Sequence, residues 1–360
     1  MNARANQSHL LAPFSPEVRL VLACVAPDAS PAATNLVRAL VADGPDWRLV
    51  ARVARWHGVH ALVFHRLSSI DGLQVPAQAM QSMREEHLGR ALRSLALARE
   101  LTRLIRLLND AAIPALAFKG PVLAKQAYGD VAMRQFIDLD LLIRHRDLPR
   151  LVEVLARDGY GARRFSPHAR DHGLFDTSEE EFAKPGGLGP LDVHWLLASP
   201  FFPYAPDVDA CFARAITVDL QDTPIATLAP RDLALFLCVH AAKHGWPALG
   251  AATDIAAVSR AYPGLNWDEI DEDARTIGCR RILLLGVTLA HYLGGASVPG
   301  RLVSDAQSNA SLARLASDVT RRMFASSGDH ASIYHDWIVP LRTIETARGK
   351  LRYCALRGLT

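Results

Sequence analysis

The spacing of apolar residues changes twice along the chain, and these changes predict how it is organised. Before about residue 109, apolar positions recur every three or four residues, as expected of helices buried on one face. We predict helices throughout 15–109, with one that begins at Asp46 and ends at Gly58. The longest, at 79–108, carries an apolar stripe made of Met83, Leu88, Leu92, Leu95, Leu101, Ile105 and Leu108.

The middle of the chain has shorter apolar runs that are interrupted by Gly, Pro and polar residues, which is typical of strands joined by turns. Strands alternating with short helices favour a small mixed sheet. We predict strands at 113–118, 136–143, 160–165, 179–184 and 191–195, helices at 121–128 and 147–158, a loop at 166–177 and a turn at 185–190.

Helical spacing returns after residue 202. The fold class predicted is therefore α/β (α+β), with a mixed sheet between N-terminal helices and a C-terminal helical bundle. The three regions expected are 1–109, 110–200 and 201–360. In the last of them we predict helices at 230–243, 253–262 and 267–293, and a basic helical segment at 331–359.

Two carboxylates stand out in the predicted strand 136–143. Asp138 and Asp140 are two residues apart, so a strand places them on the same face. Like charges side by side on a half-buried strand repel each other and are costly to desolvate. A divalent metal would remove that cost, because hard cations bind carboxylate oxygens. Asp192, in the predicted strand 191–195, could supply a third ligand, and such a group is typical of phosphoryl or nucleotidyl transfer sites.

Lys119 and Gly120 lie where a predicted strand leads into a helix. A glycine there permits close approach of a ligand to the backbone, and the N-terminus of a helix favours an anion. Lys119 would add a positive charge for the β- or γ-phosphate of a nucleotide. The alternative is a solvated loop lysine beside a turn glycine.

Two further cationic side chains lie close to the aspartates in sequence. Arg134 is four residues before Asp138, and either contacts a phosphate or pairs with one of the aspartates. His194 is two residues after Asp192 on the same strand face. It either binds the nucleotide, orients Asp192, or is a buried histidine hydrogen-bonded to a neighbour.

His240, Lys243 and His244 share one face of a predicted helix. We expect this face to line a cleft opposite the carboxylates and to contact the nucleotide, with Asp254 as a partner of Lys243. The alternative is a cationic C-terminal helix cap, because Gly245 follows. No glutamate follows His240, which argues against a zinc protease helix.

Composition adds few constraints. A net charge of +3 does not indicate a nucleic-acid partner. No run approaches about 18 apolar residues, so no transmembrane segment is expected. The five cysteines are isolated and odd in number, which favours reduced thiols and a cytoplasmic location; they are Cys24, Cys211, Cys238, Cys279 and Cys354.

With these features, the chain resembles the bacterial "uncharacterised nucleotidyltransferase" family of the DNA polymerase β-like nucleotidyltransferase superfamily. The similarity covers roughly residues 46–257. It rests on Ala117-Phe118-Lys119-Gly120, Leu123, Tyr128-Gly129-Asp130, Arg134, Asp138-Leu139-Asp140-Leu141-Leu142, Leu191-Asp192-Val193-His194-Trp195, the segments 46–59 and 240–246, and Asp254. The Gly-Ser that usually opens the first helix in the superfamily is replaced by Lys119-Gly120-Pro121, which matches the family.

The resemblance implies a mechanism. Asp138, Asp140 and Asp192 would hold two Mg²⁺ ions, or Mn²⁺ in their place, with Asp192 nearest the attacking group. A nucleoside monophosphate would pass from a nucleoside triphosphate such as ATP to a hydroxyl or phosphate acceptor. The resemblance suggests an acceptor from a biosynthetic pathway for a modified peptide or polysaccharide, and the acceptor would be a peptide, a sugar or a small molecule. The alternatives are a kinase-like phosphotransferase that uses the same site, and a nucleotide-binding partner protein without turnover.

Overall fold

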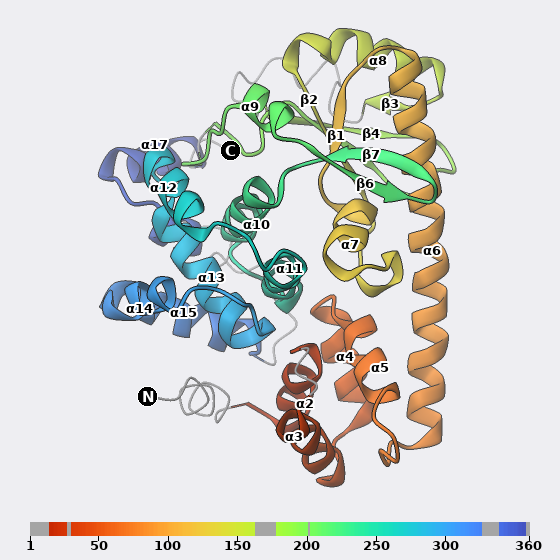
Figure 1. The fold of residues 1–360 in the computed structure, drawn as a ribbon, viewed down its shortest axis with the longest axis vertical. Coiled ribbons are helices and arrows are strands. Elements are labelled where there is room, and N and C mark those ends of the chain that lie inside the picture. Colours follow the sequence, from red (N-terminus) through yellow and green to blue (C-terminus); the bar gives the residue numbers. More distant parts are fainter. Residues whose placement is uncertain (1–13, 27–29, 163–177, 201, 326–337, 358–360) are drawn as a thin grey trace.

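A computed structural model describes residues 14–26, 30–162, 178–200, 202–325 and 338–357 (Figure 1). The predicted loop 166–177 lies outside these residues, as do parts of the predicted strand 160–165 and of the basic segment 331–359. Within the described ranges, no helix combines the length and apolar character needed to cross a membrane. Of the five cysteines, all unbridged, Cys354 is exposed and the other four are buried.

The N-terminal region is helical, as predicted. Side chains cap three of the helices: the hydroxyls of Ser15 and Ser30 accept from the backbone amides of Val18 and Ala33, and the carboxylate of Asp46 accepts from those of Arg48 and Leu49. These helices are α2 (Pro16–Val25), α3 (Pro31–Ala42), α4 (Trp47–Trp56) and α5 (His60–Ser68). The long α6 (Ala77–Asp110) then runs along one side of the molecule from this bundle to the sheet (Figure 1).

The central sheet confirms the predicted mixed topology. It has the order β1-β2-β5-β4-β3, in which β2 and β5 are parallel and the other pairs are antiparallel. Its strands are β1 (Ala115–Ala117), β2 (Leu139–Ile143), β3 (Gly161–Ala162), β4 (Glu179–Ala183) and β5 (Leu191–His194). The elements between them are α7 (Gly120–Tyr128), α8 (Leu148–Arg157) and the short 3-10 turns Val131–Met133 and His145–Asp147.

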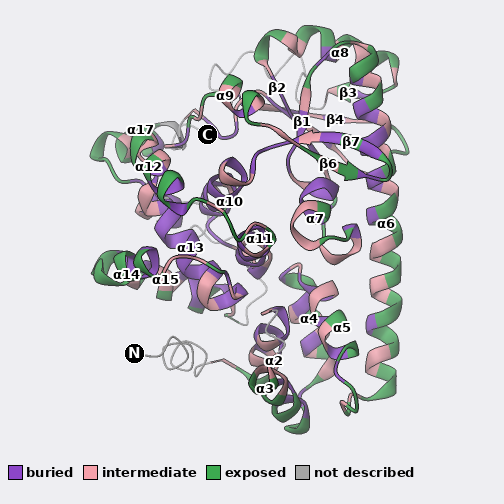
Figure 2. Cartoon of the chain, viewed as in Figure 1, coloured by how far each residue is buried: buried purple, intermediate pink, exposed green. Residues whose placement is uncertain are grey.

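Side chains alternate between the two faces of the sheet along β2 and β5, so that one face is apolar and the other carries polar residues. Leu139, Leu141, Leu191 and Val193 belong to a core that also contains buried residues of α6 and α8. The residues between them point to the opposite face, which carries the acidic side chains. Figure 2 shows the strands largely buried, although much of α6 and α8 is exposed on the outside.

A close backbone contact brings the parallel pair together. A Cβ atom on Gly189 would collide with the backbone oxygen of Ile137, so only glycine allows the turn 185–190 to approach residue 137. The amide of Leu139 then donates to the carbonyl oxygen of Pro190 at 3.0 Å. This contact lies just before Asp140 on β2 and Asp192 on β5, and it fixes the register of the two strands.

The C-terminal region contains a hairpin that the sequence analysis did not predict, because it took the chain after residue 202 as helical. β6 (Ile216–Leu220) and β7 (Thr223–Thr227) pair through a turn at Gln221 and Asp222, both with positive φ. Leu220 and Ile225 pack into the core between α6 and the sheet.

The remaining elements are helices, and one predicted helix is divided. The predicted helix 267–293 ends at Gly278, which has the left-handed conformation that stops a helix (φ 84°), and restarts after Cys279. The helices are α9 (Val208–Ala213), α10 (Pro230–Lys243), α11 (Leu249–Ala261), α12 (Trp267–Ile277), α13 (Arg280–Gly294), α14 (Gly300–Ser308), α15 (Ala310–Met323), α16 (Val339–Thr343) and α17 (Ala347–Arg357).

Candidate active site

Three neighbouring strands place their polar side chains on one face of the sheet. In the parallel pair Asp140 lies beside Asp192, and Asp192 lies beside Glu181 of β4. His194 forms the next row and lies beside Glu179. The two glutamates extend the polar face that the sequence analysis assigned to the aspartates and His194. Their two-residue spacing in a predicted strand was the available signal, but the pairing of β4 with β5 was needed to use it.

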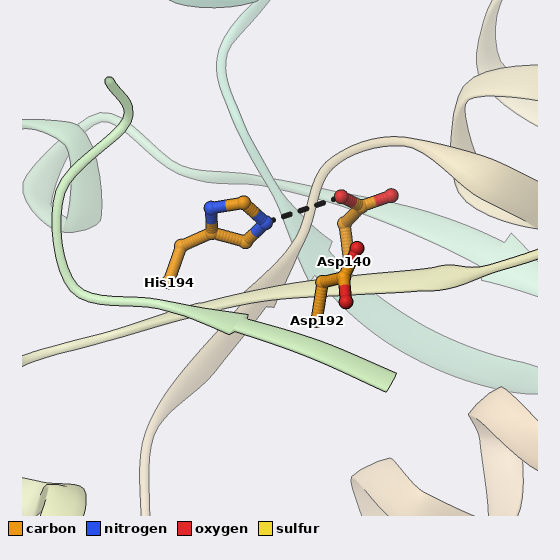
Figure 3. A group of neighbouring side chains, drawn as sticks. All are labelled: Asp140, Asp192 and His194. Atoms are coloured by element: carbon orange, nitrogen blue, oxygen red, sulfur yellow. Dashed lines mark hydrogen bonds and ion pairs between the residues drawn. The ribbon is translucent and has the colours of Figure 1, made fainter. Parts of the chain in front are cut away.

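Asp140 lies at the centre of this face and is only 2% exposed. Its Oδ1 atom is 2.5 Å from the Lys119 ammonium and 3.2 Å from Nε2 of His194 (Figure 3). Its Oδ2 atom is buried and has no hydrogen-bond partner among the described residues. Burial alone would raise the pKa of this carboxyl, but the charges and hydrogen bonds of Lys119 and His194 outweigh burial and lower it.

The other two predicted carboxylates carry the opposite pKa shift. Burial, with the charge of Asp140, raises the pKa of Asp192 to about 6. Burial and Asp140 also raise the pKa of Asp138, against the charges of Lys119 and Arg134. In both groups, burial and the charge of Asp140 outweigh the nearby cations.

Asp138 is placed differently from the other two aspartates. It lies just before β2, which begins at Leu139, and it lines the same cavity as Asp192. The compact group of ligand atoms, all within 4.8 Å of one another, consists of Asp140, Asp192 and His194. Whether Asp138 shares in metal binding therefore stays a prediction.

His194 is a buried histidine with a partner on each ring nitrogen. Nε2 is 3.2 Å from Asp140 Oδ1, and Nδ1 is 3.0 Å from Oε2 of Glu179. Burial would lower the pKa of His194, but its bonds to these two carboxylates raise it. The hydrogen bond from His194 in turn lowers the pKa of Glu179 to about 2. The ring of Phe118 packs edge-on against the imidazole at 5.1 Å.

Lys119 is not a solvated loop lysine, since its side chain is 11% exposed. Burial would lower its pKa, but Asp140 and Asp138 outweigh burial and raise it. The adjacent Gly120 begins α7 with φ +54°, and a Cβ there would lie 3.2 Å from the backbone oxygen of Asp138. The glycine is thus needed for the close contact between the start of α7 and the approach to β2.

Arg134 pairs with Asp254 and not with the predicted aspartates. Its Nε atom lies 2.9 Å from Oδ1 and 3.0 Å from Oδ2 of Asp254, and the hydroxyl of Tyr128 donates to the same Oδ1 at 2.8 Å. The expected pairing of Asp254 with Lys243 is therefore wrong. Lys243 instead lies 3.9 Å from Oε1 of Glu179.

The helix face with His240, Lys243 and His244 lines the same cavity as the carboxylates. This cavity, of about 390 Å³, lies between the polar face of the sheet and helices α10 and α11. Burial, with the charge of Lys119 and of the neighbouring cations, holds the pKa of His240 well below its usual value. His240 is therefore neutral at physiological pH and can accept or donate one hydrogen bond. Nucleotide contact by this face stays a prediction.

The residues present fit a divalent cation. Oxygen ligands from Asp140 and Asp192 converge, and the unpartnered Oδ2 of Asp140 is a buried acceptor that no protein donor among the described residues satisfies. Buried acceptors normally have a partner, so this one requires an explanation. A cation would provide it and would also offset the repulsion recorded in the pKa of Asp192.

Comparison with known proteins agrees with this geometry. A family model described as "Uncharacterised nucleotidyltransferase" matches residues 43–295, which is more than half of the chain. The match includes the whole polar face, α10 and α11. No protein with a curated description and no solved structure matches the chain.

Proposed function

The chain belongs to the uncharacterised nucleotidyltransferase family, and we propose that it transfers a nucleoside monophosphate from a nucleoside triphosphate to a hydroxyl or phosphate acceptor. The observation that carries the proposal is the unpartnered, buried Oδ2 of Asp140. Asp140 lies beside Asp192, which lines a cavity together with Asp138 and Lys119. A cytoplasmic enzyme that uses ATP, with a peptide or sugar acceptor, is the form of the proposal that we favour.

Separate groups of residues would bind the metal ions and the nucleotide. Asp138, Asp140 and Asp192 would hold two Mg²⁺ ions, with Mn²⁺ as the alternative, and these ions would neutralise phosphate charge and favour ionisation of the acceptor. Lys119, with Gly120 at the start of α7, would position the triphosphate. Arg134 and the helix face with His240 and Lys243 would complete the nucleotide pocket.

Asp192 would accept the acceptor's proton. An oxygen of the acceptor bonds to the α-phosphorus, the bond from that phosphorus to pyrophosphate breaks, and the proton passes to the Asp192 carboxylate. Asp192 suits this role because it lines the cavity and would lie nearest the acceptor oxygen.

Two labelled triphosphates test the proposal. With metal and candidate peptide or sugar acceptors, label from the α-phosphate should appear in the product, and the γ-phosphate should be released in pyrophosphate. Transfer of γ-label would indicate a kinase-like phosphotransferase. Metal-dependent nucleotide binding without transfer of either label would indicate a nucleotide-binding partner protein. The matched inactive control is Asp140→Asn, which keeps the shape of the side chain and removes its charge.

A further inference from the structure

The arrangement around His194 differs from a purely structural histidine in one respect. Its Nδ1 atom is held by Glu179 at 3.0 Å, and its Nε2 atom points to the carboxylates (Figure 3). When Nδ1–H donates to a carboxylate, Nε2 of a neutral imidazole keeps its lone pair. Metal-bound histidines usually have this arrangement, in which a carboxylate fixes the tautomer and the orientation of the ring.

The distances also suit a shared ion. Nε2 of His194 and Oδ1 of Asp140 are 3.2 Å apart. Two atoms that each lie about 2.1 Å from one metal at roughly a right angle are separated by about 3 Å. An oxygen of Asp192 completes the group, in which all ligand atoms lie within 4.8 Å of one another. Oδ1 of Asp140 also pairs with Lys119 at 2.5 Å, but Oδ2 of the same carboxylate is buried without a partner among the described residues and is free to bind an ion.

We infer that Nε2 of His194 is a metal ligand between Asp140 and Asp192, that Glu179 positions it, and that this position selects Mn²⁺ over Mg²⁺. Imidazole suits transition metals, whereas Mg²⁺ is bound mainly by oxygen and water. This inference deepens the proposed function, because it names the class of ion at the same site. Asp138 lies outside the compact group and would serve the second, all-oxygen position.

Binding of Mn²⁺ to the full chain without nucleotide tests the inference directly. Pulsed electron paramagnetic resonance should detect modulation of the Mn²⁺ signal by an imidazole nitrogen. In unmodified protein grown with 15N-labelled histidine, the modulation should change to that of the heavier isotope, and this result requires no substitution. His194→Gln should remove it. His240→Gln, which removes an imidazole from the same cavity but outside the compact group, should leave it intact.

Affinities give the second readout. His194→Gln should weaken Mn²⁺ by more than about tenfold and Mg²⁺ by less, so that the ratio of the two affinities falls. Glu179→Gln should weaken Mn²⁺ by about tenfold through the loss of ring orientation. Both variants need a circular dichroism spectrum like that of the parent, since the two side chains are buried or half-buried.

Several outcomes would overturn the inference. They are bound Mn²⁺ without nitrogen modulation, modulation that survives in His194→Gln, modulation that disappears in His240→Gln, and no Mn²⁺ binding at all. In the first case His194 would be an imidazolium bridging Asp140 and Glu179. If α-label is transferred with Mg²⁺ but bound Mn²⁺ shows no nitrogen modulation, only this inference is rejected. Clear modulation with no transfer of α-label would reject only the proposed function.

Discussion

Two buried aspartates, one on the sheet and one in the helical bundle, have similar surroundings at first sight. Asp140 is 2% exposed and Asp271, on α12, is 4% exposed, and cationic neighbours lower the pKa of each against the effect of burial. Their oxygens differ. Both oxygens of Asp271 accept hydrogen bonds, from Arg280 at 2.7 Å and from Arg275 at 2.8 Å. Asp140 has both its cations on one oxygen and none on the other.

The charged groups around Asp271 and Asp140 also differ. Arg301 also approaches Asp271, at 3.5 Å, so three arginines surround this carboxylate, and two of them also pair with Asp305 and Asp268. On the sheet, Asp138, Asp192 and Glu179 accompany Asp140 but only Lys119 and His194 are close enough to pair with it. A carboxylate whose two oxygens are both hydrogen-bonded stabilises the fold. A buried carboxylate with one unpartnered oxygen can still bind a ligand, and the pKa values of the neighbouring Asp138 and Asp192 are raised.

The largest expected effect comes from removing the charge of Asp192. Asp192→Asn should lower turnover by about three orders of magnitude or more, since it removes the proposed base, while nucleotide affinity changes modestly. The same variant, without metal, should be more stable to unfolding by on the order of 1 kcal/mol, because the parent carboxylate is ionised against burial and the charge of Asp140. Steady-state kinetics and thermal unfolding in chelator measure the two effects. Lost nucleotide binding with normal turnover at saturation would instead make Asp192 a phosphate-side ligand.

A matched pair of substitutions tests the comparison itself. Asp140→Asn should weaken metal-dependent nucleotide binding by about a hundredfold or more, because it removes the central ligand. Asp271→Asn should leave that binding unchanged and lower the free energy of unfolding by about 1–2 kcal/mol, a figure reduced because its arginines are partly exposed. Calorimetry with Mg²⁺ or Mn²⁺ and a non-hydrolysable triphosphate, together with melting curves, provides both readouts. Equal loss of binding in two folded variants would refute the distinction between these aspartates.

The sequence predicted the elements of the site better than their connections. A short apolar run located Asp192 on its own strand. The predicted strand 136–143 began too early, because β2 starts at Leu139 and its polar face therefore carries Asp140 but not Asp138. Local pattern could not reveal that β5 lies beside β2 and β4, because strand pairing depends on contacts distant in sequence. Glu179 and Glu181 were missed for that reason, as was the pairing of Arg134 with Asp254.

The same limit applies to the fold. The helical character before residue 110 was predictable from periodicity and from the caps at Ser15 and Asp46, since those are local signals. The predicted stripe on α6 is only partly buried, because Leu88, Leu92 and Leu95 are exposed. The hairpin at 216–227 was not, because its alternation covers only five residues a strand and its turn uses Gln221 and Asp222 with positive φ and no glycine. The break at Gly278 was visible as a glycine, but apolar residues on both sides continued the helical pattern.

Lowering the pH should change both the stability contribution of Asp192 and the metal affinity of the site. The pKa of Asp192 is raised from 3.8 in the unfolded chain to about 6 in the fold, so the folded state binds more protons between these values. Its contribution to stability therefore falls as the pH rises from about 4 to 6, and Asp192→Asn should remove that part of the slope. Metal affinity should show the reverse, decreasing up to about tenfold per unit as the pH falls below 6. An identical pH profile in parent and variant would contradict the shift.

The smallest effect concerns Arg134, whose Nε atom is held by Asp254 while its charge still acts on the pKa of Asp138. If the rest of the guanidinium contacts a phosphate, Asp254→Asn should weaken nucleotide binding several-fold by loosening the arginine, and Arg134→Lys should do the same. Tyr128→Phe is the control, since it removes one hydrogen bond to Asp254 and no charge. Calorimetric titration measures the affinities, and melting curves report the fold. Unchanged affinity in both charged-pair variants, with a lowered melting temperature, would make this pair a structural link between α11 and the segment before β2.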